Sequence, residues 1–255
     1  FSISTARFYV VFKEKESSKL IIHTVYYWLF FLVPVLFSFF ITSKRWKGEY
    51  HTQRLYFFER NSNWMQLIRE AKMAVNSCYT MDPMSAPIEW YHGVALFSNG
   101  DVMGAKVCFE KAYELHPYNM HVLNNLASCY ESAGEHKKAE EFYLSALSIS
   151  SDFEEARLNL SAVYYNTKEI EKAFETIDKC DVGSRDPKYK LFLTPILSSW
   201  LEDQITKEKD TVLKAQLIAL SKQPDNLVIM YTQSKKSGIQ LKKYILQTNK
   251  NNTNY

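Results

Sequence analysis

The most apolar stretch of the chain lies near its start. From Leu20 to Thr42 no Asp, Glu, Lys or Arg interrupts the sequence. As a helix this segment would extend about 34 Å at 1.5 Å per residue, which suits a hydrocarbon core of about 30 Å with some tilt. A signal peptide would have a shorter apolar region, followed by small residues rather than the basic run Lys44–Lys47. The pattern therefore predicts a polar lead-in (1–19) and a transmembrane helix (20–43), with a buried core helix as the alternative.

The chain begins with Phe1 and not with Met, so we expect a processed protein or a fragment of a longer one. Basic residues flank the apolar segment on both sides, and their usual cytoplasmic preference therefore leaves the orientation open. We expect a membrane protein, of a bacterial inner membrane, with the side of the following domain undetermined.

Beyond the apolar segment, hydrophobic and small residues recur with a period of about 34 residues. Three units follow in unbroken register: 86–119, 120–153 and 154–187. Residues of matching size recur at four places. At three of them the residues are small, where two antiparallel helices would approach closely, and at the fourth they are large. These packing positions are Gly93, Ala127 and Ser161; Ala105, Ala139 and Ala173; the larger Phe109, Tyr143 and Ile177; and Ala112, Ala146 and Cys180. Glycines mark the hairpin corners of the first two units, and Lys168 replaces the glycine in the third.

The segments on either side of the units also read as helical. Over 44–85 we expect a divergent helical hairpin whose second helix contains Trp64, Leu67, Ala71 and Ala74 and stops at Asp82–Pro83. Over 188–230 we expect capping helices, one around 191–205 and one over 211–220 that Pro224 ends. For the last segment, 231–255, we expect a short helix leading to a frayed basic and polar tail. The predicted fold is all-α, with one transmembrane helix before a helical-hairpin solenoid.

Composition and motifs indicate no chemistry. A net charge of +3 is too small to imply nucleic acid. The four cysteines form no CxxC pair, so we expect small buried thiols rather than a zinc site. No GxGxxG, GxxxxGK[ST], GxSxG or HExxH is present, and no two histidines stand four apart. We expect no catalytic residue, cofactor or metal in this segment, and we expect His92 to be a hydrogen-bonded core residue.

The residues at these recurring places resemble the tetratricopeptide repeat family. The resemblance covers three units, and the second unit matches the family pattern best. The resemblance implies a solenoid of three to four repeats, in which the first helix of each unit lines a concave groove that binds a protein or peptide. On that pattern the candidate groove residues are Trp90, Tyr91, Phe97, His121, Asn124, Asn125, Ser128, Asn159, Tyr165 and Asn166.

Two features of these residues suggest how a partner would bind. Asn125 and Asn159 stand 34 residues apart, and a ladder of amides can hold the backbone of an extended peptide. Trp90, Tyr91 and Phe97 could receive apolar side chains. The alternative is that the asparagines tie adjacent helices together and the aromatics pack against the preceding unit. The carboxylate-clamping members of the family are disfavoured, because here only Asn125 matches their pattern.

A second resemblance concerns the parent protein. Residues 117–173 look like the C-terminal repeats of O-antigen ligase or polymerase-like membrane proteins of Bacteroidetes-type bacteria. In that case the glycan-joining residues would precede Phe1. We expect a membrane-tethered protein-interaction module, with the tail of such an enzyme as the alternative and a soluble scaffold as a third possibility. The sequence leaves the partner and the oligomeric state undetermined.

Overall fold

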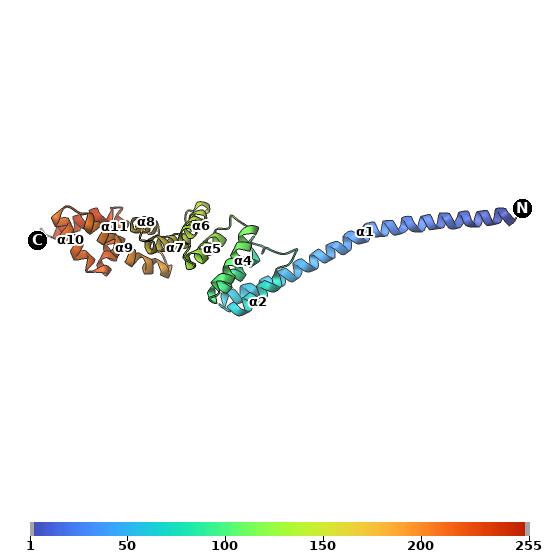
Figure 1. Ribbon diagram of the computed structural model, residues 1–255, viewed down its shortest axis with the longest axis horizontal. Helices are drawn as coiled ribbons and strands as arrows, with labels where there is room; N and C mark the ends of the chain where they lie inside the picture. The colour runs from blue at the N-terminus through green and yellow to red at the C-terminus, as the bar shows by residue number, and fades with distance from the viewer. Residues whose placement is uncertain (1–2, 253–255) are drawn as a thin grey trace. The chain divides into compact units, whose positions relative to one another are not determined.

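Helices make up most of the part of the chain that the structure describes. The computed structural model describes the backbone of residues 3–252 and the side chains of residues 26–247. It contains twelve α-helices over that range, and its extended backbone is limited there to isolated bridges (Figure 1). The chain divides into two compact units, Phe1–Ala95 and Leu96–Tyr255. The all-α prediction is confirmed.

The first unit begins with α1, a single helix from Ile3 to Arg60 (Figure 1). Tyr26–Arg60 contains a window of mean hydropathy 1.7, none of which is buried, so the helix is long and apolar enough to cross a membrane. Residues 20–25 of the predicted span lie outside the described side chains. The helix does not stop at residue 43, the predicted end of the span: α1 continues to the turn at residues 61–63, where Ser62 has φ 51.

The last turns of α1 pack against α2 (Trp64–Ala74), whose first turn is capped by Asn63. Leu55 of α1 and Leu67 and Ala71 of α2 are fully buried in this hairpin. Between them lies a buried carboxylate: Glu70 binds His51 Nδ1 at 2.7 Å and Arg54 Nε at 3.0 Å. The burial of Glu70 is therefore compensated by two nitrogen partners.

The stop that we predicted at Asp82–Pro83 is wrong, because α2 already ends at Ala74. Asp82 instead organises the following loop. Its Oδ1 accepts the backbone N–H groups of Met84 and Ala86, and its Oδ2 accepts the phenol hydroxyls of Tyr56 and Tyr91, both at 2.7 Å. One carboxylate thus holds the loop that leads into α3 (Ile88–Ser98).

The second unit consists of helical hairpins followed by further helices (Figure 1). Pro117 follows the end of α4, since proline cannot continue a helix. The helices α5 and α6 pack as one hairpin and α7 and α8 as the next. The bounds are α4 Val102–Leu115, α5 Met120–Ser132, α6 His136–Ile149, α7 Glu154–Asn166, α8 Ile170–Ile177, α9 Pro187–Lys207, α10 Thr211–Ser221, α11 Pro224–Ser237 and α12 Leu241–Asn252.

All twelve packing positions picked out by the 34-residue period are buried. Ala105, Ala139 and Ala173 have no exposed surface, and neither have Tyr143 and Ile177. Small side chains let the helix axes approach, and the large side chains fill the space beside each contact. This arrangement produces one continuous hydrophobic core from α5 to α12.

The hairpin corners repeat one backbone conformation. Gly134 has φ 76 and Lys168, at the equivalent corner, has φ 67. A lysine in this left-handed region is strained, whereas glycine adopts it freely. The third corner therefore keeps the backbone conformation of the second at an energetic cost.

The C-terminal part differs from the sequence prediction in two respects. The helix predicted over 211–220 is confirmed as α10, which ends at Ser221, but Pro224 begins a further helix, α11. Proline is well tolerated in the first turn of a helix because its missing N–H would have no partner there. The short helix predicted after residue 231 is present as α12, but residue 231 itself lies inside α11, and Leu241 and Ile245 of α12 are buried in the core rather than in a solvated tail.

Candidate functional site

The candidate site is the surface carried by α5, α7 and α9, the successive first helices of the hairpins, here called the first-helix face. These helices contact one another in that order. The predicted groove residues from His121 to Asn166 all belong to α5 and α7. The face lies within the second unit.

A chain of side-chain hydrogen bonds links the three helices. The Nδ2 amide of Asn159 donates to Asn124 Oδ1 at 3.2 Å, and Asn124 Nδ2 donates to Asn125 Oδ1 at 3.1 Å. Lys188 Nζ, from α9, donates to Asn159 Oδ1 at 3.2 Å. The structure thus brings three predicted asparagines together.

These asparagines differ in what they leave available. Asn124 and Asn159 are buried, and their contact ties α5 to α7, as in the structural alternative considered above. Asn125 is only half-buried. Within the described residues, no atom accepts a hydrogen bond from its Nδ2 group. Asn125 therefore retains two N–H donors on this face.

Charged residues surround the asparagine chain. Lys188 Nζ lies 3.8 Å from Glu155 Oε1, and the two side chains are 43% and 44% exposed. The sequence prediction of the groove does not include Lys188, because it assigns this part of the chain to a capping helix. The signal was present, since residue 188 is the first place of a further unit in the same register.

A second carboxylate, Glu131, lies near the end of α5. Tyr143 donates its hydroxyl hydrogen to Glu131 Oε2 at 3.2 Å, and the same hydroxyl lies 2.9 Å from Ser128 Oγ. Burial raises the pKa of Glu131, while the Tyr143 hydrogen bond and the charges of His136 and Lys188 oppose that rise. The fully buried Tyr143 connects α6 with the first-helix face.

The remaining predicted residues of the second unit lie around this network. His121 is exposed, with its ring 5.1 Å from that of Phe153. Tyr165 is half-buried, with Lys168 Nζ 5.8 Å from its ring centre, and Asn166 is exposed at the end of α7. These residues are accessible to a ligand.

The predicted aromatic residues differ in burial. Trp90 and Tyr91 lie in the first unit, with ring centres 4.7 Å apart. Tyr91 is buried and holds Asp82, so it belongs to the core of that unit and not to a groove. Phe97, in the second unit, is exposed.

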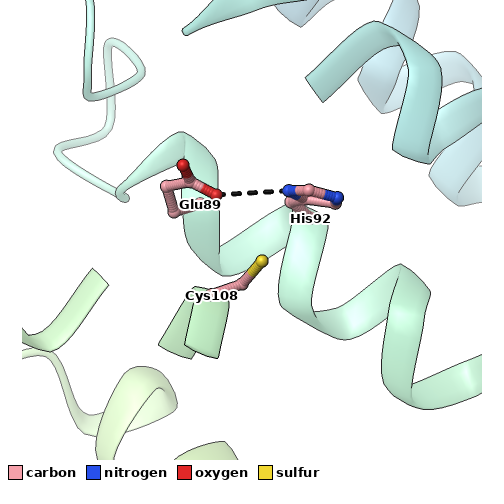
Figure 2. A group of neighbouring side chains, drawn as sticks. All are labelled: Glu89, His92 and Cys108. Atoms are coloured by element: carbon pink, nitrogen blue, oxygen red, sulfur yellow. Dashed lines mark hydrogen bonds and ion pairs between the residues drawn. The ribbon is translucent and has the colours of Figure 1, made fainter. Parts of the chain in front are cut away.

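The predicted role of His92 agrees with the structure. Figure 2 shows His92 and Glu89 one turn apart on α3, with Nδ1 and Oε2 separated by 3.2 Å. The histidine side chain is largely buried, so it is a hydrogen-bonded interior residue. Figure 2 also shows Cys108, which belongs to α4 and is buried. Cys129 and Cys180, elsewhere in the second unit, are buried as well.

Comparisons with known proteins agree with this architecture. The tetratricopeptide repeat model matches residues 108–141, a stretch one repeat long. The MamA RS-1 ArsTM double mutant shares 14% identity and a TM-score of 0.52, over 75% of this chain and 97% of that one. A tetratricopeptide repeat protein from Parabacteroides merdae shares 17% identity and a TM-score of 0.50, over 80% of this chain and 87% of that one. At these identities the likeness shows the fold alone.

A smaller structural neighbour is the first tetratricopeptide repeat domain of Spaghetti (RPAP3), bound to an HSP90 peptide. It shares 20% identity and a TM-score of 0.42, over 46% of this chain and 95% of that one. No curated protein matches the chain in sequence. The resemblance to O-antigen ligase-like tails stays a prediction, since these comparisons do not test it.

Proposed function

Because the chain carries tetratricopeptide repeats in a helical solenoid, we propose that its second unit binds an extended segment of a partner protein along the first-helix face. The observation that supports this proposal most directly is the state of the Asn125 side chain. Its side-chain oxygen is engaged by Asn124, while its N–H donors have no acceptor among the described residues. A peptide carbonyl is a suitable acceptor for such a donor.

The charges on the face indicate what kind of segment would fit. Glu131 and Glu155 contribute two carboxylates, and Lys188 offsets one of them. A segment with a basic side chain placed near Glu131 gains a charge-assisted hydrogen bond. A terminal carboxylate finds only Lys188 among these charged groups, and that lysine already contacts Glu155 and Asn159.

The test is a peptide selection on the full chain in detergent micelles, using displayed random peptides. The selected peptide is titrated against the native chain and the variants Asn125→Ala and Glu131→Gln. Loss of one hydrogen bond of about 0.5–1.5 kcal/mol predicts an affinity roughly 2- to 13-fold weaker for Asn125→Ala. Lys137→Ala is the matched control, because Lys137 is an exposed residue of α6, a second helix.

Unchanged affinity in both face variants, with normal helical signal, would exclude the first-helix face as the binding site. Asn159→Ala is kept separate from this test. Asn159 ties α5 to α7, so its loss is expected to lower the thermal midpoint as well as the affinity.

We further propose that the segment Leu20–Thr42 of α1 spans a membrane, which would be a bacterial inner membrane, and tethers the repeats to it. The support is the length and apolar composition of the window within Tyr26–Arg60, none of which is buried. The measurement is fractionation after an alkaline carbonate wash. The native chain is expected to stay in the membrane pellet, whereas Leu32→Lys combined with Leu36→Lys is expected to release it. Native chain in the soluble fraction would contradict the tether.

A further inference from the structure

The part of α1 that follows the apolar segment carries exposed aromatic side chains on one face. Trp46, Tyr50 and Phe57 are 71%, 48% and 62% exposed. We call these three residues the aromatic stripe. The opposite face, which includes His51 and Leu55, is buried in the first unit. The buried core of this unit does not include the stripe, whose side chains contact neighbours along α1 itself. Tyr50 stacks with Trp46 and accepts a hydrogen bond from Arg54, and Phe57 lies against Phe58.

The stripe continues a regular seam along α1. Exposed residues recur at alternating steps of three and four: Leu29, Leu32, Leu36, Phe39, Ser43, Trp46, Tyr50, Gln53 and Phe57. Seven of these nine are large and apolar, and the two polar ones are Ser43 and Gln53. A repeat of 3.5 residues is the spacing with which one α-helix packs along another in a coiled coil.

Lipid can cover only the beginning of the stripe. At 1.5 Å per residue, Trp46 lies about 6 Å beyond Thr42, inside a headgroup layer of roughly 5–8 Å where tryptophan is favoured. Phe57 lies about 22 Å beyond Thr42 along the same axis. A phenylalanine at that distance faces water unless protein covers it.

We propose that a second copy of this chain covers the seam, so that α1 forms a parallel two-helix coiled coil from Leu29 to Phe57. The tethering proposed above gives both copies the same orientation in the membrane, and hence a parallel pair. A parallel pair with a two-fold axis also places each seam residue against its own counterpart, so one sequence supplies both surfaces.

The shape of the stripe fits this arrangement. Tyr50, Gln53, Arg54 and Phe57 line a hollow of about 400 Å³ on α1, together with Phe58. In heptad notation Tyr50 and Phe57 occupy a positions, Gln53 a d position and Arg54 an e position. In a parallel coiled coil, two successive a residues and the d and e residues between them form the hole that receives a d side chain of the other helix. The side chain that enters is Gln53 of the second copy. A polar pair at one core position sets the register of a coiled coil.

The charges beside the stripe also suit a parallel pair. Glu49 precedes Tyr50 at a g position, and Arg54 occupies the e position five residues later. In a parallel coiled coil these two positions face each other across the interface, so Glu49 meets Arg54 of the second copy. Arg54 remains 47% exposed although it pairs with Glu70. Lys47, at the preceding e position, faces the uncharged Thr42.

The first test is oxidative cross-linking of the full chain in detergent micelles. Gln53→Cys is introduced together with Cys78→Ser, because Cys78 is partly exposed. We expect a disulfide-linked dimer from Gln53→Cys and at least tenfold less from Arg69→Cys in the same background. Arg69 is an exposed residue of α2, off the seam. Equal cross-linking of the two variants would overturn the proposal.

The second test measures association without cross-linking, by sedimentation equilibrium in density-matched detergent. Phe57→Ala is expected to raise the dimer dissociation constant more than tenfold with the helical signal unchanged. Met65→Ala, which removes an exposed apolar side chain from α2, is expected to leave it unchanged. A native chain that sediments as a monomer would overturn the proposal. So would a Phe57→Cys thiol that only lipid-soluble reagents reach, because lipid and not a second copy would then cover the stripe.

Discussion

Replacing Tyr143 by phenylalanine tests the link between the core and the first-helix face. The substitution removes one hydroxyl group from a fully buried side chain and leaves the ring in place. It takes from Glu131 its hydrogen-bond donor at 3.2 Å. Ser128 loses a contact of 2.9 Å but keeps its own bond to the Asn124 carbonyl. The main effect therefore falls on the Glu131 carboxylate.

The expected loss of stability on Tyr143→Phe follows from the charge of the hydrogen-bond acceptor, the Glu131 carboxylate. A hydrogen bond to a charged group contributes about 1.5–3 kcal/mol, and the half-buried position of Glu131 places the cost toward the lower end, near 2 kcal/mol. For a unit of this size each kcal/mol lowers the thermal midpoint by about 2–4 °C. We therefore expect a decrease of roughly 4–8 °C at neutral pH.

The cost should depend on pH in a defined direction. Burial raises the pKa of Glu131, and the Tyr143 hydrogen bond lowers it, so Tyr143→Phe raises this pKa further. A carboxyl whose pKa is raised in the folded state destabilises the fold when ionised, and the penalty disappears as the pH falls through that pKa. The difference between native chain and variant should thus be largest at neutral pH and shrink in mild acid.

The assay is denaturant unfolding followed by circular dichroism for the native chain, Tyr143→Phe, Glu131→Gln and the double variant. A neutral amide at position 131 gains less than a carboxylate from the hydrogen bond of the Tyr143 hydroxyl. Tyr143→Phe should therefore lower the free energy of unfolding less in the Glu131→Gln background than in the native chain. Single effects that add to within about 0.5 kcal/mol, with no pH dependence of the difference, would refute the coupling of Tyr143 to Glu131.

Further substitutions test the corners, the packing and the first unit. Lys168→Gly should stabilise the chain by about 1 kcal/mol because φ is 67 there, whereas Gly134→Ala at φ 76 should destabilise it similarly; equal unfolding midpoints would contradict the strain. Ala139→Trp should overpack a fully buried position and lower the thermal midpoint sharply, and native-like melting would mean that the repeat register is misplaced. Asp82→Ala should remove four hydrogen bonds and speed amide exchange at Met84 and Ala86, and unchanged exchange would show that the loop is held otherwise.

Much of the second unit followed from the sequence by itself. The 34-residue period predicted which alanines and aromatics pack, and each of them is buried. This succeeds because helical geometry is local: residues three and four apart share a face, and small side chains must stand where two axes approach. The same reasoning located the strained corner at Lys168. The buried pair Leu241 and Ile245 also has this spacing, although the basic composition of the tail obscured it.

The partners of the polar groups were decided only by the tertiary structure. The sequence pairs Asn125 with Asn159 by register, whereas Asn159 binds Asn124 and Lys188. Tyr91 likewise holds Asp82 in the core of the first unit. A hydrogen bond requires two atoms within about 3 Å, and that separation depends on how one hairpin is rotated against the next. Such rotation results from the packing of the whole core, so no local pattern contains it.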